Sequence, residues 1–157
     1  MLLRAGLIAL ICFSVAPAEK YSGPRPAKPD IPYLVHADTL IETEVIEAKE
    51  EKKKDDLTYV VSGVSSPVKT PLTGPVFIFQ AGELQADRIQ LYKFDVKNGR
   101  RQVLYSHKGK VSARPRRINV NPLGGDLFKI EVDESLENGE YAFTPEGSNQ
   151  VFCFQVY

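Results

Sequence analysis

The stretch "RIQLYKFDVKNGRRQVLYS" (residues 88–106) decides the fold class, because two alternating segments flank the pair Asn98-Gly99. An Asn-Gly pair supplies the two positive φ angles of a type I′ turn, which joins the strands of a β-hairpin. Counting outward from the turn predicts four facing pairs: Lys97 with Arg100, Val96 with Arg101, Phe94 with Val103, and Tyr92 with Tyr105. The stretch therefore predicts an antiparallel hairpin with one aromatic face.

Two-residue periodicity continues on both sides of this hairpin. "PVFIFQ" (75–80) is apolar on both faces, as expected of a central strand. "RINVNPLGGDLFKIEVDE" (117–134) turns at Gly124-Gly125-Asp126 and predicts a half-buried antiparallel pair. The polar run "EAKEEKKKDD" (47–56) has no apolar stripe, which favours a hairpin tip over a helix. We expect about eight strands with short connections and no helix, which predicts an all-β antiparallel sandwich over residues 33–157.

The end of the chain refines this expectation. In "LENGEYAF" (136–143), Leu136 precedes Gly139 by three residues, and Tyr141 follows two residues later, just before a strand. This pattern resembles the tyrosine corner of immunoglobulin-like sandwiches, in which the phenol hydrogen-bonds backbone a few residues upstream. The resemblance implies that Tyr141 is the corner residue, Leu136 its buried companion and Gly139 the tight turn. Phe143 stands where an antibody-type domain has its cysteine, and the chain has no tryptophan.

The same ending, "GEYAF…VFCF", is similar to the tails of exported bacterial proteins of unassigned function. Residues 1–18 fit export, since Arg4 precedes an apolar run that ends at small residues around Pro17. This run is too short to span a membrane, so we expect a signal peptide that is cleaved after Ala18. Residues 19–32 carry four prolines and predict an extended leader. The expected location is the periplasm or the extracellular space, with no membrane insertion after cleavage.

Motifs that carry chemistry are absent from the sequence. There is no G-x-S-x-G nucleophile motif, and neither His36 nor His107 has a second histidine or a cysteine at metal-ligand spacing. Cys153 is the only cysteine after the predicted cleavage site, and its apolar neighbours indicate a buried side chain rather than a reactive thiol. We therefore predict no catalytic residue, no metal site and no cofactor.

Charge is distributed unevenly along a chain whose formal net charge is zero. Residues 88–117 hold ten basic side chains and one acid, whereas residues 118–157 hold seven acids and Lys129. One interpretation is that basic and acidic strands lie side by side and pair weakly. The other is an exposed basic loop that docks an acidic partner through five residues: Lys108, Lys110, Arg114, Arg116 and Arg117.

The sequence thus predicts an exported, non-catalytic binding or structural module whose partner is a protein or an anionic envelope polymer. Nucleic acid is disfavoured, because export and overall neutrality oppose it. Two alternatives stay open. One is a small eight-stranded outer-membrane β-barrel, since exported barrels often end on an aromatic residue and the last residue is Tyr157. The other is a hydrolase whose site the sequence does not reveal.

Overall fold

The structure is a computed structural model that describes residues 20–106 and 113–157. In these residues the chain forms fourteen strands and one short 3₁₀ helix, η1 (Ala86–Arg88). All strand ladders are antiparallel except that of β6 (Lys69–Thr70) with β14 (Gln150–Val156). The prediction of an all-β antiparallel fold is confirmed. The predicted signal peptide, residues 1–18, lies outside the described residues.

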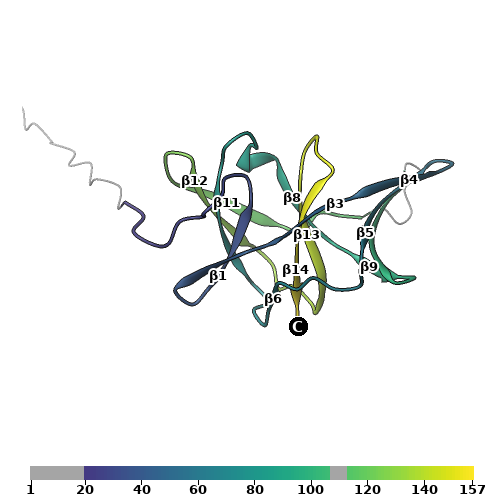
Figure 1. Cartoon of the computed structure of the whole chain (residues 1–157), viewed down its shortest axis with the longest axis horizontal. Coiled ribbons are helices and arrows are strands. Elements are labelled where there is room, and N and C mark those ends of the chain that lie inside the picture. The colour runs from purple at the N-terminus through teal and green to yellow at the C-terminus, as the bar shows by residue number, and fades with distance from the viewer. Residues whose placement is uncertain (1–19, 107–112) are drawn as a thin grey trace, which may run out of the picture.

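The strands form three sheets, which Figure 1 shows side by side. Outer sheet A has the order β11 (Ile118–Gly124), β12 (Leu127–Val132), β7 (Val76–Gln80), β1 (Pro32–His36) and β2 (Thr39–Glu42). Middle sheet B has the order β3 (Glu44–Glu47), β14, β13 (Gly139–Pro145) and β8 (Ile89–Lys93), with β6 added beside β14. Outer sheet C has the order β4 (Lys49–Lys53), β5 (Asp56–Ser62), β10 (Arg100–Ser106) and β9 (Asp95–Lys97).

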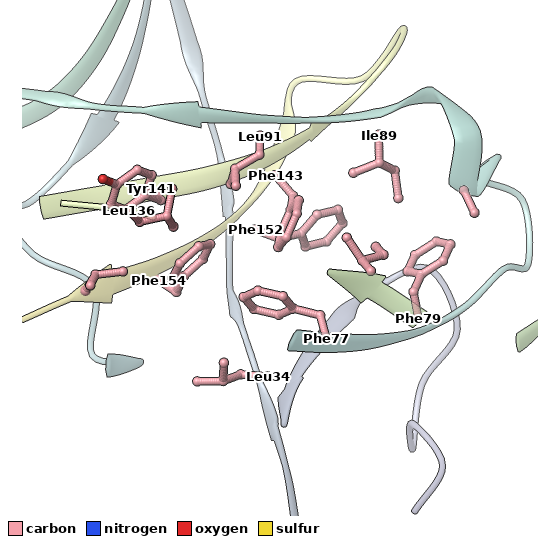
Figure 2. Packing of buried hydrophobic residues seen from close by; sticks show 13 residues of the cluster. Leu34, Phe77, Phe79, Ile89, Leu91, Leu136, Tyr141, Phe143, Phe152 and Phe154 are labelled. Atoms are coloured by element: carbon pink, nitrogen blue, oxygen red, sulfur yellow. The ribbon is translucent and has the colours of Figure 1, made fainter. Parts of the chain in front are cut away.

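Middle sheet B is buried on both faces, so the apolar interior is divided into two cores. On the face toward sheet A, Phe143 and Phe154 pack against Phe77, with ring centroids 4.7 and 4.9 Å away. Figure 2 shows these rings pointing toward one another from the two sheets. On the face toward sheet C, Ala142 and Cys153 pack in a second core with residues of β5 and β10. Because successive side chains along β13 and β14 point to opposite faces of the sheet, each strand contributes residues to both cores.

The fourteen strands in three sheets replace the sandwich of about eight strands that the periodicity predicted. The difference arises because single extended segments change sheets. Residues 39–53 run through β2, β3 and β4, passing from sheet A to B at Thr43 and from B to C at Ala48. The Thr43 hydroxyl donates a hydrogen bond to the Pro32 carbonyl at 2.7 Å, and Ala48 is 3% exposed. A small or hydrogen-bonded residue therefore occupies each crossing.

The Asn98-Gly99 turn has the predicted conformation, with φ of 52° and 73°. Lys97 pairs with Arg100 and Val96 with Arg101, as expected. The pairing predicted beyond them is wrong, because the chain leaves sheet C at Phe94 and β8 pairs with β13 instead. Tyr92 therefore lies opposite Ala142 in sheet B and meets Tyr105 across the gap between sheets, with ring centroids 5.5 Å apart.

Tyr141, near the start of β13, makes a contact of the kind that the resemblance to a tyrosine corner implies. Its hydroxyl donates a 2.8 Å hydrogen bond to the Glu137 carbonyl, and its side chain is fully buried. Leu136 is also buried, in the core between sheets A and B. A methyl group on Gly139 would lie 2.9 Å from Lys93 Cε, so the flexible Lys93 side chain would have to move to accommodate it. β13 and β14 are the last two strands, as predicted, and β14 lies inside sheet B rather than at its edge.

Part of the proline-rich leader is attached to the domain. The Asp30 carboxylate accepts hydrogen bonds from the backbone N–H groups of Gly82, Glu83 and Leu84, at 2.7, 2.8 and 3.0 Å. Burial raises the pKa of Asp30, but these three hydrogen bonds outweigh burial and lower the pKa below its ordinary value. The first strand begins at Pro32, one residue before the expected start of the domain.

Candidate functional site

The basic segment of residues 113–117 is fixed to two sheets by its backbone. The N–H of Ala113 donates to the Leu104 carbonyl of β10 at 2.8 Å, and the N–H of Arg116 donates to the Leu91 carbonyl of β8 at 2.7 Å. The segment is thereby bonded to one strand of sheet C and one strand of sheet B. The arginines of this segment therefore project from a backbone that is held at two points, a requirement for a precise binding surface.

This segment borders a groove of about 600 Å³. Five cationic side chains from β8, β9 and the fixed segment line the groove: Lys93, Lys97, Arg114, Arg116 and Arg117. Two carboxylates, those of Asp95 and Glu134, also line it. Lys97, Arg114 and Arg117 are exposed, and no salt bridge joins them to an acid within residues 20–106 and 113–157. The groove consequently carries an excess of positive charge facing solvent.

Three of the five predicted binding residues, Arg114, Arg116 and Arg117, line this groove together. The other two, Lys108 and Lys110, lie outside the described residues. Sequence reasoning did not assign Lys93 and Lys97 to the site, although both belong to the basic stretch. The signal that could have found Lys97 is the hairpin, which brings β9 beside β10, whereas Lys93 belongs to β8, which pairs with β13.

Four described basic residues of the stretch are paired with acids, and one of them, Lys93, also lines the groove. Arg88 contacts Glu146 at 3.7 Å and Lys93 contacts Glu137 at 2.8 Å, so these two pairs join the basic middle to the acidic end. The hydrogen bond and positive charge of Lys93 lower the pKa of Glu137. Arg100 forms a two-bond contact with Glu51, at 2.7 and 3.0 Å. Some basic residues of the stretch therefore pair with acids of the domain, as the first interpretation expects, whereas others are exposed in the groove without a salt bridge to a described acid.

Arg101 is the one basic residue among those described in the stretch that lies in the interior. Its side chain is 1% exposed and donates to Glu44 through two bonds, at 2.7 and 3.0 Å, and to the Ser62 carbonyl at 2.9 Å. Glu140 lies 3.8 Å away. Burial lowers the pKa of Arg101, but the hydrogen bonds and charge of Glu44, with the charge of Glu140, outweigh burial and raise it. This cluster joins sheet C to sheet B and is unavailable to a partner.

Of the cysteine and histidine side chains considered in the sequence, the structure describes Cys153 and His36. Burial raises the pKa of the Cys153 thiol to about 12, since the nearby Arg101 charge offsets only part of the effect. A buried neutral thiol is a weak nucleophile. His36 is exposed at the end of β1, whereas His107 lies outside the described residues. Within those residues there is no group of three His, Cys, Asp or Glu that could hold a metal ion, and no helix long and apolar enough to cross a membrane.

No protein-family model, curated protein or solved structure matches the chain. The case for function therefore depends on the geometry and charge of the groove.

Proposed function

We propose that the protein is an exported, non-catalytic binding module whose basic groove docks an acidic partner. One observation carries the proposal: the exposed cations Lys97, Arg114 and Arg117 share one groove, and no salt bridge joins their side chains to an acid of the described residues. Glu134 is in contact with Arg117 only through the backbone, since its carboxylate accepts a hydrogen bond from the Arg117 N–H at 3.0 Å. A surface cation pairs readily with an acid when one is near, and several other cations of the stretch do so. Unpaired cations gathered in one place favour an external anion.

Arginine suits this role because its planar guanidinium binds a carboxylate or a phosphate through two parallel hydrogen bonds. The fixed backbone around Arg114 and Arg116 reduces the entropy lost when the partner binds. An acidic protein segment and an anionic envelope polymer both offer the required anions. Polyglutamate and polyphosphate represent these two sources in a binding assay.

The test is a charge reversal with a matched control. We expect the double substitution Arg114→Glu and Arg117→Glu to weaken binding of a labelled oligoglutamate or polyphosphate at low salt by about tenfold or more, since like charges then face each other. The control, Arg25→Glu with Lys69→Glu, changes the net charge equally at two exposed residues outside the groove. Fluorescence anisotropy of the labelled polymer measures both affinities.

Equal loss of binding in the two double variants would contradict the proposal that the groove is the binding site and would indicate a response to net charge alone. Unchanged binding in the groove variant would contradict the proposal as well. Raising the salt concentration should weaken binding to the natural protein, because exposed charges are screened beyond about 10 Å at 0.1 M salt. The polymer that binds more tightly identifies the class of partner.

Export and the immunoglobulin-like resemblance belong to the same proposal. Export is supported by the pattern of residues 1–18, and N-terminal sequencing of the secreted protein should find the chain beginning at Glu19. The Tyr141–Glu137 contact supports a tyrosine corner, whereas the third sheet goes beyond the two layers of an immunoglobulin-like sandwich.

A further inference from the structure

A second cavity lies between sheets B and C, apart from the basic groove. Its volume is about 540 Å³, within the range of small-molecule sites. Residues of β5, β8, β10 and β13 form its walls, and the turn between β13 and β14, residues 146–149, borders it. Of the residues that the structure describes, only Val103 lines both this cavity and the groove.

Four aromatic side chains contribute to the lining of this cavity. Tyr59 and Tyr92 each pack edge-to-face against Tyr105, with ring centroids 5.5 Å away and interplanar angles of 87° and 69°. Phe94 adds a fourth ring to the wall. The Tyr92 hydroxyl donates a 2.8 Å hydrogen bond to Gln90 Oε1, which fixes this ring. The rings come from three strands and the β8–β9 link, so the fold, and not local sequence, assembles them.

The charge of this cavity is opposite to that of the groove. Among the described residues, none of the seventeen that line it is Lys, Arg or His, whereas Glu50 and Glu146 contribute two carboxylates. Glu146 has Arg88 at 3.7 Å, so Glu50 provides the less compensated charge. Burial and the negative charge of Glu50 raise the pKa of Tyr59, and burial together with its tyrosine neighbours raises that of Tyr105. These tyrosines therefore stay protonated at neutral pH, and their rings remain neutral π surfaces.

We propose that this cavity binds a small organic cation with an apolar body, such as a quaternary ammonium or a protonated amine. Aromatic faces attract such a cation through their quadrupole, and a nearby carboxylate adds a Coulombic attraction. The apolar wall, which includes Leu57, Val103 and Val151, accommodates the methyl groups. An anion would meet two carboxylates and no cation among the described lining residues, which disfavours its binding.

The test compares choline with its uncharged isostere 3,3-dimethylbutan-1-ol, which has the same shape without the positive charge. We expect choline to bind about tenfold more tightly, given the strength of cation–π contacts in partly desolvated sites. An NMR titration that follows the tyrosine ring protons measures both affinities. Equal binding of the two probes, tighter binding of a neutral methyl glucoside, or no binding of choline would overturn the proposal.

Four variants assign the binding to this cavity. Tyr105→Leu removes one aromatic face and should weaken choline binding about tenfold, whereas Tyr105→Phe keeps the face and should preserve it. Glu50→Gln removes the charge and should also weaken binding, whereas Glu51→Gln alters the next residue, which contacts Arg100 outside the cavity, and should not. Circular dichroism checks that each variant is folded. If Tyr105→Phe loses as much affinity as Tyr105→Leu, or if both glutamate variants behave alike, the proposed role of the rings and of Glu50 is wrong.

The cavity and the basic groove can be tested independently. The substitutions Arg114→Glu and Arg117→Glu should leave choline binding unchanged, because neither residue lines the cavity. Loss of choline binding in that variant would contradict the assignment to the cavity between sheets B and C.

Discussion

Arg100 and Arg101 are neighbours in the sequence, form the same two-bond contact with a glutamate, and differ in burial. Arg101 is 1% exposed, whereas Arg100 is 34% exposed. Removing one partner of a buried ion pair leaves the other without compensation and costs about 3–5 kcal/mol, whereas exposed pairs contribute about 0–1 kcal/mol. We therefore expect Arg101→Met to lower the free energy of unfolding by about 3 kcal/mol or more and Arg100→Met by under about 1 kcal/mol. Urea denaturation of both variants checks this, and equal losses would contradict it.

Asp30 makes stability depend on acidic pH. Its pKa is lower in the folded chain than the ordinary value of 3.8, so the folded state favours the ionised form. The stabilisation is therefore present above the unfolded pKa and is lost as the pH falls through the folded pKa. We expect Asp30→Asn to be less stable than the natural protein at neutral pH, by about 1–3 kcal/mol, and the difference to shrink below about pH 4. Parallel urea denaturation series from neutral to acidic pH measure this, and a difference that is constant with pH would refute it.

Single residues show where prediction from sequence reaches its limit. Strand alternation places Arg101 on the same face as Val103 and Tyr105, which is correct, but it does not show that this face is buried around a cation. The partner Glu44 is 57 residues away in the chain, and only the fold brings the two side chains together. Arg114, Arg116 and Arg117 were predictable as a group because they are nearly contiguous, whereas Lys93 and Lys97 reach the groove through strand pairing.

At the scale of the element, turn chemistry is the most reliable information in the sequence. The β9–β10 hairpin depends on Gly99, whose φ of 73° is one that side chains rarely adopt. We expect Gly99→Ala to cost about 1–2 kcal/mol, since a Cβ disfavours this conformation. Gly74→Ala is the matched control, because Gly74 lacks a positive φ and an added Cβ there meets no atom within 4 Å. Thermal or urea denaturation compares the two, and an equal effect would mean that the turn conformation is not what matters.

Turns predict local pairing, and the longer-range pairing depends on which faces are apolar. The turn at residues 98–99 correctly fixes the two pairs beside it. Beyond them, Ile89 and Leu91 point into one core and Tyr92 points into the other, so β8 needs apolar layers on both sides. Only middle sheet B offers them, and β8 therefore pairs with β13. The alternating hydrophobic pattern contains this information, but reading it requires knowing that there are two cores.

At the scale of the whole molecule, the middle sheet makes the two cores depend on each other. Phe152 and Phe154 of β14 face sheet A, while Val151 and Cys153 of the same strand face sheet C. The buried contact of Arg101 with Glu44 adds a polar connection between sheets C and B. A strand that supports one core in this way cannot lose its order without disturbing the other.

We therefore expect the three sheets to unfold in a single cooperative transition. Ile130→Ala in sheet A should cost about 2–5 kcal/mol, and Val103→Ala in sheet C about 2 kcal/mol, from lost burial and the cavity left behind. If the sheets are coupled, each substitution should speed amide hydrogen exchange in both outer sheets. The reason is that sheet B, which packs on both of them, would unfold in the same opening event. Peptides from β7 and β12 report on sheet A, and peptides from β5 and β10 on sheet C, in exchange experiments followed by mass spectrometry. A response to Val103→Ala that is confined to β5 and β10 would instead indicate that sheet C opens alone, and the cavity between sheets B and C would then lie at the less stable boundary of the fold.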